Sequence, residues 1–144
     1  MPEGMTFHMM PVWGEYITNM TITIDGTILA SKRHTNWPWT VKHDSKHPEK
    51  PPTTQVRKLF DFYEVHNFSI VGKGTVDGQG YMWWIREYLG TNHYGRPHLM
   101  YIHSATNLEM AGVRYINAAY YHIEAVDFDG AYFHDFEIFV NVKG

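Results

Sequence analysis

Apolar and polar residues alternate along residues 16–29, where threonine and aspartate separate the apolar side chains. The apolar positions are Ile17, Met20, Ile22, Ile24 and Ile28. A period of two predicts short β-strands that turn one face toward a core. Asp25-Gly26, near the end of this segment, has the composition of a turn.

The same pattern recurs along the chain. With an offset of 40, residues 59–76 align with residues 99–116, so that Asn67 meets Asn107 and Gly72 meets Gly112. With an offset of 48, residues 19–28 align with residues 67–76, and Asn19 meets Asn67. The first alignment also pairs apolar positions: Phe60/Met100, Phe62/Ile102, Phe68/Leu108, Ile70/Met110 and Val76/Ile116. A repeated unit of this size predicts a solenoid.

We therefore expect an all-β fold, a parallel β-helix of about four coils in a single domain over residues 1–144. Residues 5–10 are expected to form a strand before the first coil, which begins near Tyr16. Gly130 lies 23 residues after Asn107, the spacing of one uninterrupted coil. Asn19, Asn67 and Asn107 should stack as a ladder, because asparagine tolerates the left-handed backbone of a bend.

Two insertions interrupt the coils. Residues 31–56 contain four prolines and are interpreted as a long surface loop. His43 and His47, with Asp44 between them, could hold a metal on a helix, but the prolines argue against one and favour a solvated loop. Residues 81–97 are expected to form a short amphipathic turn or helix. Its Trp83 and Trp84 either clamp an exposed coil edge or form a platform for a sugar.

The glycines of residues 72–80 invite comparison with a nucleotide-binding loop. The stretch Gly72-Lys73-Gly74-Thr75 does not complete Gly-x-Gly-x-x-Gly, and the Gly-Lys-Ser/Thr of a phosphate loop is missing. Gly78 and Gly80 are expected to continue turning and not to open a helix. We interpret the glycines as tight turns with closely packed backbone.

Composition narrows the function classes. The net charge of −3 and the lack of a basic run argue against nucleic acid, and no apolar run is long enough to cross a membrane. There is no cysteine, so disulfides are excluded. The ten histidines are expected to be scattered over the surface. No metal site and no cofactor site is predicted, and no signal peptide is recognisable.

Several segments resemble the polygalacturonase family, glycoside hydrolase family 28. Residues 67–84 resemble its "GxGxIDGQGxxWW" segment, and Arg96-Pro97-His98-Leu99 resembles its "RPxL" segment. Residues 19–38 resemble its "DGTIxAS…NWP" segment. The resemblance covers nearly all of the chain but only the N-terminal portion of the family. It implies a right-handed parallel β-helix that is truncated at both ends, and an extracellular location.

The family hydrolyses galacturonic acid links in pectin, and the resemblance implies that activity for a complete protein. Its catalytic motifs are Asn-Thr-Asp, a paired Asp-Asp, Gly-His-Gly and Arg-Ile-Lys, and none is found here. The segment Asp127-Phe128-Asp129-Gly130 is superficially similar to the first motif, but lies one coil too early. We therefore assign no catalytic residue, and Trp83 and Trp84 are the candidates for substrate binding.

Two hypotheses remain open. The chain is the N-terminal part of a polygalacturonase-like hydrolase of pectin-type polysaccharide, inactive alone, or it is a non-catalytic β-solenoid that binds a glycan or a protein. In both cases we expect the isolated chain to self-associate, because a solenoid without caps exposes open strand edges.

Overall fold

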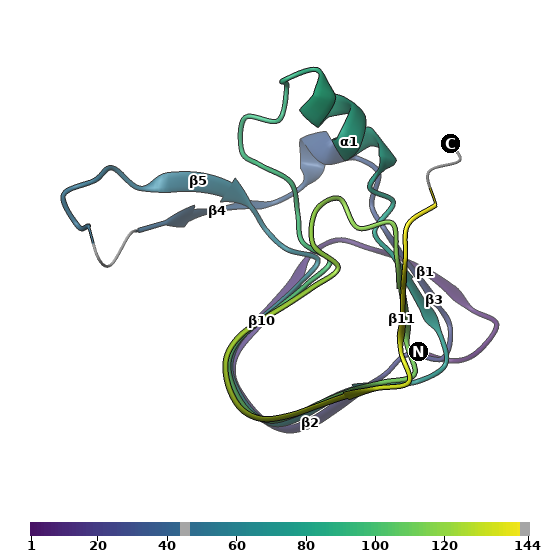
Figure 1. Cartoon of the computed structure of the whole chain (residues 1–144). Helices are drawn as coiled ribbons and strands as arrows, with labels where there is room; N and C mark the ends of the chain where they lie inside the picture. The colour runs from purple at the N-terminus through teal and green to yellow at the C-terminus, as the bar shows by residue number, and fades with distance from the viewer. Residues whose placement is uncertain (44–46, 142–144) are drawn as a thin grey trace.

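The computed structural model describes residues 1–43 and 47–141. Within them, four strands of twelve residues form a parallel sheet in the order β10-β8-β6-β2, here called the long-strand sheet. Its members are β2 (Val12–Thr23), β6 (Phe60–Val71), β8 (Met100–Ala111) and β10 (Ile123–His134). Each long strand is followed by a short strand on the other side of the coil, so that each pair makes one turn of a solenoid (Figure 1).

The short strands form a second parallel sheet in the order β1-β3-β7-β9-β11, here called the short-strand sheet. Its members are β1 (Thr6–Met9), β3 (Thr27–Ala30), β7 (Thr75–Asp77), β9 (Arg114–Ile116) and β11 (Glu137–Phe139). Seen along the coil axis, the chain turns anticlockwise as it advances toward the viewer, which makes the β-helix right-handed (Figure 1). The all-β parallel β-helix of four coils is thereby confirmed, with β1 as the expected strand before the first coil.

The register agrees with the offsets in the sequence. Phe60 pairs with Met100 and Val76 with Tyr115, while Met20 pairs with Phe68 one coil earlier. The offset of 40 therefore holds along the long strands, but it slips by one residue in the short strands. The first coil also starts earlier than expected, at Val12.

Each long strand bends twice, at residues with positive φ that are three positions apart. These pairs are Tyr16/Asn19, Glu64/Asn67, Ser104/Asn107 and Asp127/Gly130. At the second bend, Nδ2 of Asn67 donates to Oδ1 of Asn19 at 2.8 Å, and Nδ2 of Asn107 donates to Oδ1 of Asn67 at 2.9 Å. The asparagine ladder is thus confirmed. Gly130 continues the left-handed bend in the fourth coil without adding a rung.

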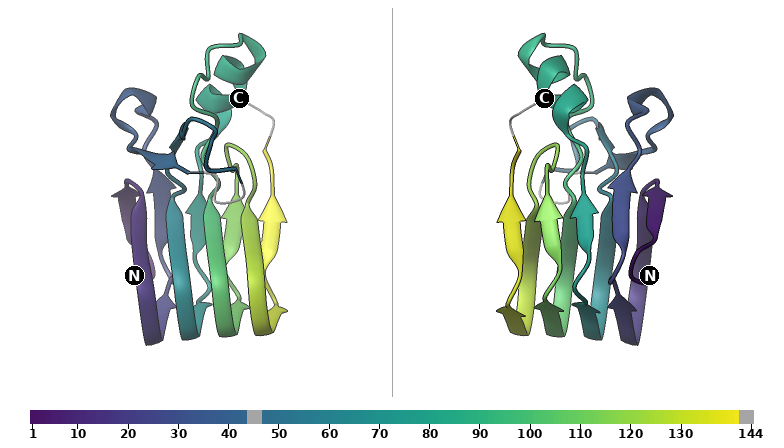
Figure 2. Two further views of the ribbon diagram at one scale, coloured as in Figure 1. Left: turned by 90° about the vertical axis from the view of Figure 1, so that its left-hand side faces the viewer. Right: turned by 90° about the vertical axis from the view of Figure 1, so that its right-hand side faces the viewer.

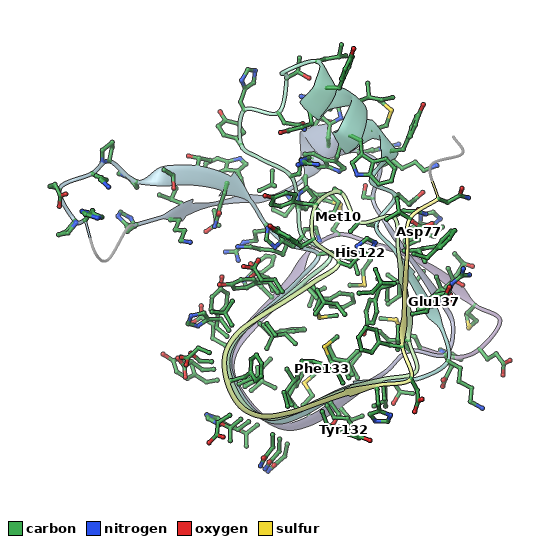
Figure 3. All side chains as sticks on the ribbon, in the orientation of Figure 1. Met10, Asp77, His122, Tyr132, Phe133 and Glu137 are labelled. Atoms are coloured by element: carbon green, nitrogen blue, oxygen red, sulfur yellow. The ribbon has the colours of Figure 1, made fainter. Side chains whose placement is uncertain are left out.

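Alternation along the strands fills the coil with apolar side chains. Phe68, Ile70, Leu108 and Met110 are fully buried or nearly so. In the last coil, Phe133 points into the coil and Tyr132 points away from it (Figure 3). The inward side chains of successive coils stack on one another and form a continuous apolar core. The packing of this core therefore depends on the register between neighbouring coils.

The glycine stretch supplies close backbone contact between coils. A Cβ on Gly74 would overlap the carbonyl oxygens of Gly26 and Ile24, and a Cβ on Gly72 would overlap the carbonyl of Ile24. The amide of Gly74 donates to Ile24 O at 2.8 Å, and that of Gly80 donates to Asn117 O at 2.9 Å. These amides are therefore engaged with neighbouring coils and are not free to hold a phosphate.

The insertions lie together on one side of the solenoid, where the short strands end and the long strands begin (Figure 2). Residues 31–56 form more than a loop. They contain a 3₁₀ turn at His34–Asn36 and an antiparallel hairpin of β4 (Trp39–Lys42) and β5 (Thr53–Val56). The expectation of a plain surface loop is wrong here, because the prolines fall between and beside these two strands and not within them.

The second insertion contains the expected short helix, α1 (Tyr81–Tyr88). It begins directly after Gly80, so the expectation that the glycine stretch does not open a helix is wrong. In the part of the chain that is described, no helix has the length and apolar character needed to cross a membrane.

Candidate functional site

The two insertions meet through a pair of tryptophans. Trp37 and Trp83 are both buried, with their rings edge to face at a centroid distance of 5.7 Å. Nε1 of Trp37 donates to the carbonyl oxygen of Arg57 at 2.7 Å. Since Arg57 and Lys58 lead directly into β6, this contact positions both cations above the start of the long-strand sheet.

At this end of the long-strand sheet, side chains on the outer face form two rows across the coils. One row runs from Trp13 through Asp61 and Tyr101 to Glu124, and the other from Glu15 through Tyr63 and His103 to Val126. Outward side chains of successive coils lie over one another in columns (Figure 3). We call Asp61, Tyr63, Tyr101, His103 and Glu124 the Tyr101 face.

Aromatic rings cover much of the Tyr101 face. The rings of Tyr63 and Tyr101 are 5.6 Å apart, and Tyr101 stacks on His103 with an interplanar angle of 17° at 6.3 Å. Nζ of Lys58 lies 4.7 Å from the centre of the Tyr101 ring. Such a surface offers flat apolar contact beside a positive charge.

Asp61 and Lys58 are the buried charged residues of this region, with 1% and 7% of their surfaces exposed. Oδ2 of Asp61 lies 3.5 Å from Nη1 of Arg57, whereas Oδ1 has no hydrogen-bond partner. Burial raises the pKa of Asp61, and the charge of Lys58 opposes this shift. Burial likewise lowers the pKa of Lys58, and the charge of Asp61 opposes that shift. The pair thus places two ionisable groups with shifted pKa values in a poorly solvated environment, as functional sites often do.

A second contact joins Glu124 of the Tyr101 face to His98, which lies just before β8. Nδ1 of His98 lies 2.6 Å from Oε2 of Glu124, a close contact without hydrogen-bond geometry. Burial lowers the pKa of His98, although Glu124 acts in the opposite direction. Burial also raises the pKa of the Tyr63 and Tyr101 hydroxyls, so both stay protonated and able to donate hydrogen bonds.

A pocket of about 290 Å³ opens beside the face, and we call it the Lys58 pocket. Lys58, Arg96 and His98 line it together with the rings of Tyr94 and Tyr120. The guanidinium of Arg96 lies 4.6 Å from the centre of the Tyr120 ring, and its Nε is 3.6 Å from a carboxylate oxygen of Glu87. With two cations and one carboxylate, the pocket suits an anionic ligand that has an apolar ring face.

The tryptophans proposed from the sequence lie elsewhere. Trp83 is 5% exposed and packs on Trp37, and both line a pocket of about 310 Å³ between the insertions. Nε1 of Trp84 donates to Ala118 O at 3.1 Å, and its half-buried ring lines a different pocket. Substrate binding remains a prediction for both tryptophans, and Trp83 also packs the two insertions together.

Other candidates from the sequence lie apart from the Tyr101 face or have structural roles. Asp127 stands at a bend and accepts a hydrogen bond from Oγ of Ser104 at 3.1 Å, a contact between coils. The histidines are scattered over the described chain, and five are half-buried: His34, His98, His103, His122 and His134. Asp44 lies outside the described residues. Among residues 1–43 and 47–141, no cluster of His, Asp or Glu is placed to hold a metal ion.

The residues of the Tyr101 face were missed, although the sequence held a signal. The offset of 40 that pairs Phe60 with Met100 also pairs the residues between the buried positions. Those residues are Asp61 with Tyr101 and Tyr63 with His103. Polar and aromatic side chains at the outward positions of aligned strands could have marked this face.

The sequence model described as glycosyl hydrolases family 28 matches residues 1–143. None of the curated proteins matches the sequence. Several solved structures share the fold, and two of them are named here. The hyperthermoactive exopolygalacturonase from Thermotoga maritima has 19% identity and a TM-score of 0.74 over 97% of this chain and 38% of its own. The endo-xylogalacturonan hydrolase from Aspergillus tubingensis has 19% identity and a TM-score of 0.76 over 100% of this chain and 36% of its own. The chain thus spans little more than a third of either protein.

Proposed function

Since the chain belongs to glycosyl hydrolases family 28, we propose that it forms the part of a pectin-directed glycoside hydrolase that holds the polysaccharide. The ligand is a run of acidic sugars, which lies along the Tyr101 face with one carboxylate in the Lys58 pocket. The chain alone binds this ligand but does not cleave it.

The observation that carries this proposal is the cluster of aromatic rings on two adjacent strands, β6 and β8, beside buried and half-buried cations. Tyr63, Tyr101 and His103 lie on adjacent strands, so their rings can contact successive parts of one chain of sugars. Lys58 and Arg96 provide the charge that a uronate carboxylate requires. A neutral polymer would use the rings but not the cations.

The burial of one of the two carboxylates in this region supports the proposal of binding without cleavage. Asp61 and Glu124 stand two strands apart in one row, so their Cα atoms are separated by about 9.6 Å. In inverting glycosidases the two carboxyl groups themselves stand about 6.5–9.5 Å apart. However, Asp61 is only 1% exposed beneath its cations and cannot reach a glycosidic oxygen.

Binding is tested by titrating the chain with a tetramer of galacturonate in a calorimeter. Lys58→Met removes the charge with similar volume, and Tyr120→Ala removes an exposed ring of the pocket. Each is expected to weaken binding about tenfold, the effect of one charge-assisted hydrogen bond or ring contact. Lys73→Met and Tyr88→Ala are matched controls at exposed positions outside the pocket. Equal losses in the controls would remove the support for this site.

Cleavage is tested by measuring reducing ends released from polygalacturonate. We expect none from the isolated chain, because the Tyr101 face presents no exposed pair of carboxylates. Sustained release that survives Asp61→Asn and Glu124→Gln would show that other groups of this chain are catalytic. Loss of the release in both variants would identify those two carboxylates as the acid and base. Either result refutes the proposal of binding without cleavage.

The second hypothesis, a non-catalytic β-solenoid binding module, predicts the same binding. The two hypotheses differ in the reading frame of the gene downstream of Gly144. A continuation that encodes the missing Asp-Asp and Gly-His-Gly motifs supports the hydrolase, and a stop codon supports the binding module.

We also propose that the isolated chain self-associates. The strands β10 and β11 form one edge of their sheets, and Phe128, Phe133 and Ile138 of that coil are substantially exposed. Unpaired strands with apolar side chains promote pairing with another chain. Sedimentation equilibrium should reveal assemblies that grow with concentration, whereas a stable monomer would contradict this proposal.

A further inference from the structure

The pocket of about 310 Å³ between the two insertions has aromatic walls and one cation. It lies between the 3₁₀ turn, the hairpin, α1 and the segment that follows α1. The large rings that line it are those of Trp37, Trp39, Trp83 and Tyr94. Among its described lining residues, Arg86 carries the only permanent charge. We call this cavity the Arg86 pocket.

Contacts within the protein keep the walls of the Arg86 pocket in place. The amide of Val56, at the end of β5, donates to Tyr94 O at 3.0 Å and so joins the hairpin to the second insertion. The ring of His34 packs edge to face on Trp83 at 6.4 Å, beside the contact of Trp37 with Trp83. Because these contacts form without a ligand, binding in the pocket has a small ordering cost.

The guanidinium of Arg86 is fixed by neutral groups. Its Nη2 donates to Thr91 O at 2.8 Å, and its Nε donates to Oδ1 of Asn92 at 3.3 Å. Within residues 1–43 and 47–141, no carboxylate forms an ion pair with Arg86, since Glu87 pairs with Arg96 instead. Arg86 is half-buried. A positive charge without a counter-ion in direct contact therefore stands at the aromatic walls.

This combination selects one class of ligand. The planar N–H groups of a guanidinium match the two oxygens of a carboxylate, and the charge opposes a cationic ligand despite the aromatic walls. A sugar would need partners for several hydroxyls. The hydroxyl of Thr91 already donates to Arg86 O, and Nδ2 of Asn92 donates to Trp83 O. Flat apolar rings favour a flat apolar ligand.

We propose that the Arg86 pocket binds a small aromatic carboxylate. The ring of the ligand lies against Trp39 and Tyr94, whose side chains are 61% and 53% exposed, and the carboxylate accepts hydrogen bonds from Arg86. The volume is at the lower end of the range for small-molecule sites, about 300–1,000 Å³, so one ring with a short acidic side chain fits. This inference is independent of the proposed binding of polysaccharide.

The test is calorimetric titration of the whole chain with cinnamate and with cinnamide, its neutral counterpart. Arg86 also holds Thr91 and Asn92, so its charge is tested through the ligand and not by substitution. We expect cinnamide to bind at least about tenfold more weakly than cinnamate. Trp39→Ala should weaken cinnamate binding about tenfold, whereas Trp13→Ala, a matched control at a 53% exposed tryptophan outside the pocket, should change it less than about twofold.

A second comparison separates this site from the Lys58 pocket, with which it shares Val56, Tyr94 and Gly95. The double variant Lys58→Met/Tyr120→Ala should keep its affinity for cinnamate within about twofold. If that variant loses cinnamate and Trp39→Ala does not, the anion binds in the Lys58 pocket and the inference is overturned, while the proposed function is untouched.

Other results would also overturn the inference. These are equal affinity for cinnamate and cinnamide, equal losses in Trp39→Ala and Trp13→Ala, and no detectable binding at about 1 mM cinnamate. Galacturonate carries the carboxylate on a saturated, hydroxylated ring and should bind this pocket more weakly than cinnamate. Tighter binding of galacturonate that Trp39→Ala weakens would replace the aromatic acid with a sugar acid.

Discussion

The asparagine ladder gives the sharpest prediction for stability. Asn67 is its central rung and forms two hydrogen bonds, at 2.8 and 2.9 Å, to the coils on either side. Its backbone is left-handed, with φ of 49°. Replacing it with alanine removes both bonds and places in the left-handed region a residue that lacks the short polar side chain by which asparagine tolerates it.

The size of the effect can be worked from these contacts. An exposed hydrogen bond contributes about 0.5–1 kcal/mol, so two contribute about 1–2 kcal/mol. The left-handed backbone adds about 1 kcal/mol for alanine. We therefore expect Asn67→Ala to lower the free energy of unfolding by about 2–3 kcal/mol. Asn67→Gly keeps the backbone and should cost about 1–2 kcal/mol.

The assay is urea unfolding followed by tryptophan fluorescence, with the free energy taken by linear extrapolation. Asn19→Gly is the control, because Asn19 forms one hydrogen bond of the ladder and Asn67 forms two. It should cost about half as much as Asn67→Gly. If both Asn67 variants unfold within about 0.5 kcal/mol of the wild type, the ladder does not hold the coils in register, and this reasoning is refuted.

Three further predictions concern single residues. Gly74→Ala would place a Cβ against carbonyl oxygens of the preceding coil and should prevent stable folding. In the control Gly90→Ala the new Cβ has nothing within 4 Å, so the free energy of unfolding should fall by only about 1 kcal/mol, and equal thermal midpoints of the two variants would contradict this prediction. The Tyr115 hydroxyl is buried without a hydrogen-bond partner, and burial raises its pKa. Tyr115→Phe should therefore leave the free energy of unfolding unchanged or raise it, and a loss above about 1 kcal/mol would show that the hydroxyl has a hydrogen-bond partner. Hydrogen bonds to Asp135 and Glu109 raise the pKa of His134 above 6.5. The protonated imidazole therefore stabilises the fold fully below pH 6.5, and this stabilisation is lost as the pH rises through the raised pKa. His134→Gln should therefore be less stable than the wild type at about pH 5.5 and equally stable at about pH 8.5, and a gap that does not change with pH would argue against the ion pairs.

The fold was predictable because the coils repeat their physical constraints. Alternating apolar residues, asparagine at the second bend of the first three coils and glycine at close backbone contacts recur at fixed offsets. The pattern in one coil therefore strengthens the same interpretation of the next. The start of β2 was missed because Trp13 and Glu15 give no apolar alternation. The hairpin was missed because Pro48, Pro51 and Pro52 dominate the composition of its connection.

The site was harder to predict, because it depends on side chains whose environment is set by other coils. Nothing in the local sequence indicates that Asp61 is buried. It is buried because Arg57 and Lys58 lie over it, and the hydrogen bond from Trp37 to the carbonyl oxygen of Arg57 positions these two residues. The sequence pointed instead to Trp83 and Trp84, which are conspicuous by their size. Trp83 joins the two insertions, a role that only their arrangement in space reveals.

The most direct test of the account compares binding of polygalacturonate with binding of the same polymer after full methyl esterification, which removes its charge. If the cations of the Lys58 pocket hold the uronate carboxylates, the chain should bind the free acid and lose most of that affinity on esterification or in high salt. Equal affinity for the charged and the esterified polymer would contradict the central claim.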